Sequence, residues 1–150
     1  MQRILSLVLF VVLVLGGGLL IGALTLPGTW YDQLAKPAIN PPGWVFGPVW
    51  TVLYVAIAFA GWLVWKQDRV GLAMRLWWVQ LALNFLWSPV FFVAHQTGLA
   101  FSIILSLLVA IVAFILVAWR QNRRAALLFI PYAVWVAFAS ILNAAIFVLN

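Results

Sequence analysis

The chain has 150 residues, of which 68% are hydrophobic, 16% are aromatic and only 7% carry a charge, a composition too apolar for a soluble domain. The absence of cysteine excludes disulfides, thiolate catalysis and cysteine metal ligands. The net charge of +6 is interpreted as a signal of membrane topology, and nucleic acid is not expected as a partner.

Charged residues leave four long blocks of the chain without Asp, Glu, Lys or Arg, and these blocks can be converted into membrane spans. A helix rises about 1.5 Å per residue, so crossing a hydrocarbon core of about 30 Å takes about 20 residues. Residues 4–31 and 125–150 each fit one helix, and 37–65 fits one that starts after a Pro-Pro-Gly triplet. The block 76–119 is too long for one span and is divided by the polar sequence His-Gln-Thr-Gly. The predicted spans are residues 4–26, 44–65, 72–94, 99–119 and 125–149.

The expected fold is an all-α integral membrane protein: one domain, residues 1–150, formed by a bundle of five transmembrane helices with a folded loop between helices one and two. Helices are favoured because each apolar block can satisfy its backbone amides internally, whereas an unpaired amide in lipid costs several kcal/mol. A porin-like barrel is excluded because residues 103–117 are almost continuously apolar and do not alternate with period two.

Basic residues are distributed unevenly between the two sides that five crossings create. The amino terminus and the second and fourth connections hold seven of the eight Lys and Arg residues, and only Lys36 lies on the other side. The positive-inside rule then places the amino terminus in the cytoplasm of a bacterial-type cell, with the chain in the inner membrane. Residues 1–26 are interpreted as an uncleaved first span, because the apolar run is long and no Ala-x-Ala-like site follows it.

The first connection, residues 27–43, has the sequence PGTWYDQLAKPAINPPG, which is unusually mixed for a linker. Its prolines and glycines, its aromatic pair Trp30 and Tyr31 and its two opposite charges support two interpretations. One is an interfacial segment, since Trp and Tyr favour the headgroup region and proline ends helices. The other is a folded lid over one mouth of the bundle, since long loops in compact domains often bind ligands.

Polar and aromatic residues recur at helical spacing in three of the predicted spans. At about 100° per residue, the members of each set lie on one face of their helix. The sets are Phe46, Trp50 and Tyr54; Gln80, Asn84, Trp87 and Phe91; and Tyr132, Trp135, Ala139 and Asn143. Because an amide in hydrocarbon needs a hydrogen-bond partner, Gln80, Asn84 and Asn143 are expected to face the bundle interior. They serve either as contacts between helices or as the polar groups of an aromatic cavity for a flat apolar ligand.

The sequence offers little for catalysis or for metal binding. The sequence has no paired carboxylate, catalytic triad or phosphate-binding glycine loop, and its single histidine, His95, is expected to be a solvated turn residue rather than a haem ligand. No metal site and no covalent cofactor are expected. Small residues at Gly18 and Gly22, and along the fourth span, allow helices to approach closely, either within the bundle or at a homodimer seam.

Three runs of the chain, in the same order, resemble the tryptophan-rich sensory protein and translocator protein family, also called the peripheral-type benzodiazepine receptor family. The runs are WYDQLAKPAINPPGWVFGPVWTVLY (30–54), QLALNFLWSPVFF (80–92) and PYAVWVAFASILN (131–143). The resemblance implies a five-helix membrane bundle, often dimeric, in which the first connection folds over a pocket. It also implies that this pocket binds porphyrins such as protoporphyrin IX, sterols and benzodiazepine-type ligands.

The resemblance assigns the family's pocket to those positions of this sequence that match the family's motifs. The resemblance assigns Trp30 and Tyr31 to the lid, Pro41 and Pro42 to its return, and Trp50, Tyr54, Asn84, Trp87, Trp135, Ala139 and Leu142 to the walls formed by helices. For Trp30 and Trp135 it also implies a role in light-dependent oxidative breakdown of a bound porphyrin. These two residues are therefore the catalytic candidates.

The chain departs from the family pattern at Ile39, where members often have an aromatic residue in the lid, and it lacks the sterol motif of the animal members. The expected function is a membrane receptor or sensor that binds porphyrins in an intramembrane pocket and senses or moves them. Two alternatives stay open: light-dependent porphyrin oxidation, and a structural or assembly protein without a ligand. The resemblance also leaves the outer membrane open as the location.

Overall fold

The structure, a computed structural model, describes residues 2–150, which form helices and connecting segments without a β-strand. The helices are α1 (Gln2–Val11), α2 (Gly17–Leu24), α3 (Thr29–Gln33), α4 (Phe46–Gln67), α5 (Leu72–Ser88), α6 (Thr97–Gln121) and α7 (Arg123–Leu149). Five continuous helical stretches are long and apolar enough to cross a membrane: Gln2–Leu24, Gly43–Gln67, Leu72–Val93, Thr97–Gln121 and Arg123–Leu149. The predicted fold class, an all-α membrane protein with five transmembrane helices, is confirmed.

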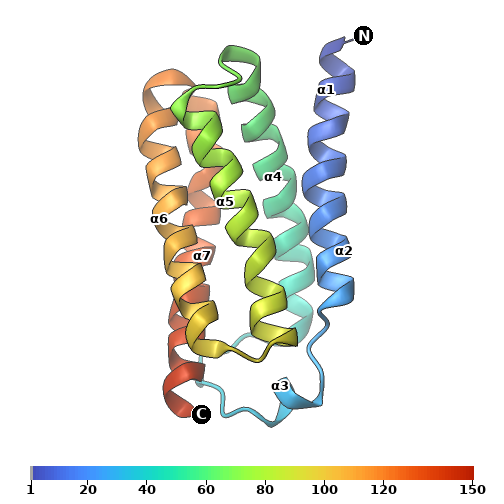
Figure 1. Ribbon diagram of the computed structural model, residues 1–150, viewed down its shortest axis with the longest axis vertical. Helices are drawn as coiled ribbons and strands as arrows, with labels where there is room; N and C mark the ends of the chain where they lie inside the picture. Colours follow the sequence, from blue (N-terminus) through green and yellow to red (C-terminus); the bar gives the residue numbers. More distant parts are fainter. Residues whose placement is uncertain (1) are drawn as a thin grey trace.

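The five spans stand side by side, and consecutive spans run in opposite directions (Figure 1). α4, α5, α6 and α7 form the body of the bundle, in which α6 packs against α5 and α7, and α4 packs against α7. The first span lies outside this body, where α1 packs on α4 and α2 packs on α5. The short helix α3 covers the end at which the carboxyl terminus lies, here called the lid end (Figure 1). The opposite end, which carries the amino terminus and most basic residues, is called the basic end.

Two spans contain a π-helical segment that the hydrophobic pattern does not predict. Val12–Gly16 joins α1 to α2, and Pro89–Val93 continues α5. In the second segment Pro89 supplies no backbone donor, and the wider turn is closed by a hydrogen bond from the Ala94 N–H to the Pro89 carbonyl at 3.0 Å. This last turn of the third span carries Phe91, which is only 2% exposed and becomes the contact point for the lid.

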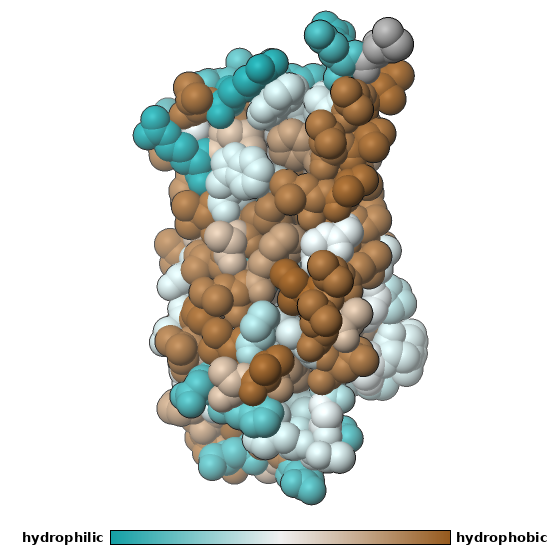
Figure 2. All heavy atoms as spheres, turned by 45° about the vertical axis from the view of Figure 1, so that its right-hand side comes forward, coloured by the Kyte–Doolittle hydropathy of each residue, from teal (hydrophilic) through white to brown (hydrophobic). Residues whose placement is uncertain are grey.

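On the face shown in Figure 2, the surface between the two ends is mostly hydrophobic, whereas hydrophilic residues gather at the ends. Leu9, Val109 and Val134, for example, are 60%, 69% and 67% exposed. A continuous apolar surface of this kind is not tolerated in water, but in a bilayer it faces the acyl chains. The chain is therefore an integral membrane protein.

Several glycines permit an aromatic ring of another span to approach the backbone, and the approach is closest at Gly18 and Gly61. A methyl group at Gly18 would overlap the ring of Tyr54, and one at Gly61 would overlap the indole of Trp77. Gly18 thus serves packing within the bundle, because it brings the first span against α4. Gly22 has open space around it. A homodimer seam along the first or the fourth span stays a prediction.

Candidate functional site

The directions of the helices determine the level of each candidate side chain along the bundle axis. α4 runs away from the lid end, whereas α5 and α7 run towards it (Figure 1). Tyr54, Asn84 and Tyr132 therefore lie at a middle level, and Trp50 and Trp87 lie about one turn nearer to the lid. The site has three layers: a floor at the middle level, walls on its lid side, and the lid itself.

The floor is a hydrogen-bonded network that connects α4, α5 and α7. The Tyr54 hydroxyl donates to Asn84 Oδ1 at 3.2 Å, and Asn84 Nδ2 donates to the Tyr132 hydroxyl at 2.7 Å. Tyr132 donates in turn to Gln80 Oε1 at 2.9 Å, and Gln80 Nε2 donates to the Trp77 carbonyl at 2.9 Å. Gln80 and Tyr132 are completely buried, and Asn84 is 6% exposed. The amides of the third span face the bundle interior as predicted, and both find their partners within the protein.

The walls carry partly buried aromatic rings. On α4, Trp50 lies edge to face against Tyr132, with ring centroids 6.3 Å apart. On α5, Trp87 is stacked on Phe91 at 5.1 Å, and its Nε1 donates to Asn143 Oδ1 of α7 at 3.0 Å. Ring faces with a few fixed polar groups are the usual composition of a site for a flat apolar ligand.

Trp135 lies on α7 where this helix meets α4. Its ring is edge to face with Phe46 at 5.9 Å and 5.7 Å from Phe138, and its buried Nε1 has no hydrogen-bond partner among residues 2–150. Trp135 also lines a groove of about 850 Å³ between α4 and α7. Val52 and Val134 line the same groove and are 68% and 67% exposed, so the groove opens on the outside of the bundle. Trp135 therefore lies at the boundary between the bundle interior and the lipid.

The remaining predicted contacts lie near the lid end of α7 and before α4. Leu142 is 5% exposed, and Ala139 is partly buried against the main core. Pro41 and Pro42 lie where the chain leaves the lid, and the Pro42 carbonyl accepts a hydrogen bond from the Val45 N–H at 3.0 Å in the turn that leads into α4. A hollow enclosed by the floor, walls and lid stays a prediction.

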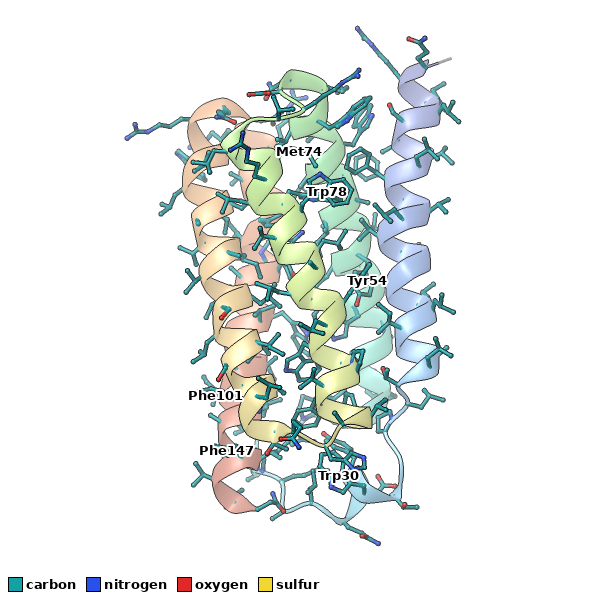
Figure 3. The ribbon with its side chains drawn as sticks, in the orientation of Figure 1. Trp30, Tyr54, Met74, Trp78, Phe101 and Phe147 are labelled. Carbon is teal, nitrogen blue, oxygen red and sulfur yellow. The ribbon has the colours of Figure 1, made fainter. Side chains whose placement is uncertain are left out.

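The lid is held against the bundle by aromatic contacts. Trp30 and Tyr31 of α3 both meet Phe91 edge to face, with ring centroids 5.9 and 6.2 Å apart. Trp30 is also stacked on His95 at 4.0 Å, and His95 has a left-handed backbone with φ of 56°. Figure 3 shows Trp30 between α3 and the ends of the long helices. Residues 27–43 are thus folded onto the bundle, as the lid interpretation requires.

Further contacts fasten the edges of the lid. The Asn150 side chain donates to the Ala35 carbonyl at 3.1 Å and accepts from the Ala35 N–H at 3.0 Å. Lys36 Nζ lies 4.6 Å from the centre of the Tyr31 ring, and burial raises the pKa of the Tyr31 hydroxyl. Ile39 is 56% exposed, so the residue that replaces the family's aromatic ring contributes little to the packing of the lid.

Two contacts that support the site are not predicted by the sequence. Trp77 is completely buried and donates from Nε1 to the Ile57 carbonyl at 2.9 Å, in the space that Gly61 leaves. His95, expected to be a solvated turn residue, is exposed, but it also supports Trp30 of the lid. Both contacts depend on which elements meet in the folded chain, and residue spacing within one helix does not show this.

Comparisons with known proteins agree with the fold and the motifs. Residues 10–149 match the model of the TspO/MBR family. The chain is 42% identical to the translocator protein of Homo sapiens over 120 residues, which cover 76% of this chain and 70% of the human protein. It is 40% identical to the tryptophan-rich protein TspO of Chlorobaculum tepidum over 130 residues, 83% of this chain and 82% of that protein. It is 37% identical to the tryptophan-rich sensory protein of Cereibacter sphaeroides over 122 residues, 81% of this chain and 77% of that protein. This chain belongs to the TspO/MBR family.

Proposed function

We propose that this membrane protein is a receptor for a flat, largely apolar tetrapyrrole such as protoporphyrin IX, which binds between the lid and the floor. The observation that supports this most directly is the gathering of aromatic rings from three spans and from α3 at one end of the bundle. Ring faces give stacking and dispersion contacts to a planar ligand, and their uncharged surroundings avoid the desolvation of a charge. Trp135, on the groove between α4 and α7, is where a ligand dissolved in lipid meets these rings.

Binding is tested by titrating the purified protein with protoporphyrin IX in the dark and following the absorbance of the porphyrin. Replacing Trp50 and Trp135 together with alanine removes one ring from each of two walls. Two ring contacts contribute about 1–3 kcal/mol beyond their buried area, so the double variant should bind at least about fivefold more weakly.

The matched control replaces Phe59 and Trp119 with alanine, two aromatic side chains of the outer surface that are 38% and 41% exposed. This pair removes the same number of rings from the protein but none from the proposed site. Its affinity for protoporphyrin IX should stay within about twofold of the native value. An equal loss of affinity in the two double variants contradicts the proposed site.

A structural protein without a ligand is the second candidate, because one observation favours it. Gln80, Asn84, Tyr132 and Asn143 already satisfy one another or the backbone, which is also what simple interhelical contacts would do. Under this hypothesis the porphyrin titration does not saturate in the native protein. The substitutions in the walls then change only the stability of the bundle.

Light-dependent oxidation of the porphyrin stays a separate prediction for Trp30 and Trp135. It requires that illumination of the complex in the presence of dissolved oxygen, which serves as the oxidant, consumes the porphyrin and produces a new absorbing product. The variant Trp30→Phe should then slow this consumption without a matching loss of affinity in the dark. An unchanged rate of consumption excludes a role for this indole.

The distribution of charge supports an inner membrane with the basic end in the cytoplasm and the lid outside. Seven of the eight Lys and Arg residues lie at the amino terminus or in the second and fourth connections. Because the chain has no cysteine, single cysteines at the exposed positions Gly28 and Val70 can be labelled selectively in spheroplasts. An impermeant thiol reagent should label Gly28→Cys and spare Val70→Cys, and the reverse pattern contradicts this orientation.

A further inference from the structure

A second groove lies at the basic end of the bundle, away from the lid. It has a volume of about 1060 Å³ and is lined by the first span as far as Leu13, by the end of α4 and Arg69 just after it, and by Trp78 of α5. The groove exists because α1 packs on α4, whereas the first span packs on α5 further from this end, through α2. Figure 3 shows Trp78 on the side of α5 that faces the first span. The groove is thus a gap between three helices within the membrane-spanning part of the protein.

The inner surface of this groove is apolar and accessible from the lipid. Leu5, Leu9 and Leu13 follow one another at intervals of four along the first span, and they are 61%, 60% and 42% exposed although they line the groove. From Arg3 to Leu13 a helix rises about 15 Å, which is half of a hydrocarbon core of about 30 Å. The groove therefore has the depth of one lipid leaflet.

The mouth of the groove is cationic. Arg3, Lys66 and Arg69 line it together with the polar side chains of the first turns of α1. Lys66 Nζ lies 3.8 Å from the centre of the Trp62 ring, and the Arg69 guanidinium carbon lies 4.1 Å from the centre of the Trp65 ring. These cation–π contacts hold two of the three charges at the level where α4 leaves the membrane.

Little negative charge is available within the chain to neutralise this mouth. The chain has two acidic residues, and Asp32 lies on α3 at the lid end. Asp68 follows α4, but its Oδ1 accepts hydrogen bonds from the N–H groups of Val70 and Gly71 at 3.1 and 3.0 Å. Three cations against at most one carboxylate leave a net positive charge that an external anion can meet.

We infer that this groove is a binding site for an anionic phospholipid of the leaflet at the basic end. The phosphodiester group lies among Arg3, Lys66 and Arg69, and one acyl chain lies along the leucines of the first span. Positive charge at the mouth selects an anionic headgroup over a zwitterionic one. The apolar inner surface, which is as deep as one leaflet, selects a lipid over a free anion. The bound lipid fills the gap between α1 and α5 and fastens the first span to the bundle.

The test is native mass spectrometry of the full chain in detergent, which measures the affinity for the first bound phosphatidylglycerol and, separately, phosphatidylcholine of the same chain length. One basic residue near an anionic headgroup contributes about fivefold in affinity, so the native protein should prefer phosphatidylglycerol at least about tenfold. The variant Arg3→Gln/Lys66→Gln/Arg69→Gln should bind the two lipids equally. Leu9→Trp, which fills part of the groove without changing its charge, should weaken phosphatidylglycerol binding at least about fivefold.

The matched control is Arg120→Gln/Arg123→Gln/Arg124→Gln, which removes the same charge from the same end of the bundle outside the groove. It should keep the preference for phosphatidylglycerol. An equal loss in the two triple variants, or equal binding of both lipids by the native protein, overturns the proposal. Displacement of phosphatidylglycerol by inorganic phosphate overturns it as well, because the site would then bind a free anion, and displacement by protoporphyrin IX assigns the groove to the porphyrin instead.

Circular dichroism checks that each variant keeps its helix content. Should the triple variant of the groove fail to fold, the single variant Arg3→Gln replaces it, because Arg3 is exposed and supports no core contact. It should lower the preference for phosphatidylglycerol by about fivefold. An unchanged preference in this variant contradicts the proposal.

Discussion

The variant Tyr132→Phe removes a single oxygen from the completely buried centre of the floor. That oxygen accepts from Asn84 Nδ2 at 2.7 Å and donates to Gln80 Oε1 at 2.9 Å. Hydrogen bonds inside membrane bundles average about 0.6 kcal/mol, so two of them contribute about 1.2 kcal/mol. A buried polar atom that loses its partner costs about 1–3 kcal/mol, and here each amide keeps one bond, from Tyr54 or to the backbone. We expect the free energy of unfolding to fall by about 1–3 kcal/mol.

The measurement is reversible unfolding of the purified protein in mixed micelles of increasing SDS content, followed by circular dichroism. Tyr54→Phe is the matched control, because it removes the same chemical group but only one hydrogen bond, of 3.2 Å, and should cost about half as much. A change below about 0.5 kcal/mol in Tyr132→Phe would refute the network as the main polar contact between α5 and α7. A larger loss in Tyr54→Phe than in Tyr132→Phe would do so as well.

Three further substitutions test other contacts. Gly18→Val places a branched side chain where the Tyr54 ring lies, and it should lower the free energy of unfolding by about 1–3 kcal/mol in the same SDS titration; native stability would contradict the close contact. Trp30→Ala removes one of the lid's two ring contacts with Phe91 and its stacking on His95, and it should speed proteolysis of the first connection, whereas an unchanged rate would show that the lid is held elsewhere. Asn122→Ala removes the side-chain cap of α7 and should cost about 1 kcal/mol in the SDS titration, and a neutral effect would rule out the cap.

The number of spans can be predicted from the sequence because charge is confined to short interruptions between apolar blocks, and a charge in hydrocarbon is expensive. The π-helical segments Val12–Gly16 and Pro89–Val93 cannot be predicted in this way, since they change the backbone bonding and leave the hydropathy unchanged. Pro131 is a second case in which the local sequence does not predict the backbone. It is a strong helix breaker in soluble proteins, yet it lies inside α7 as an exposed residue, and proline is tolerated in transmembrane helices.

The candidate site is predictable to the extent that it lies on one face of each helix. Spacing shows that Gln80 and Asn84 share a face of α5, but not that the Tyr132 hydroxyl of α7 lies between them. Spacing also groups Tyr132 with Trp135, although residues three apart differ by about 60° around the helix. In the structure the two side chains accordingly have different surroundings: Tyr132 is completely buried, and Trp135 lines the groove between α4 and α7. Which faces meet is decided by contacts between helices, and one helix alone does not contain that information.

The polar groups of the floor already have hydrogen-bond partners, and this restricts the kind of ligand that the proposed site selects. Since Asn84 and Gln80 bond to Tyr54, Tyr132 and the backbone, they offer few free hydrogen-bonding groups to a guest. The ammonium group of Lys36 in the lid is equally engaged, because its Nζ donates to the backbone carbonyls of Asp32 and Leu34 at 3.2 and 3.4 Å. Recognition in the proposed site must therefore come from ring faces and shape, with the polar edge of the ligand left at the lid. Such a site discriminates between ligands by planarity and size much more than by polar substituents, because it has few free hydrogen-bonding groups that could recognise those substituents.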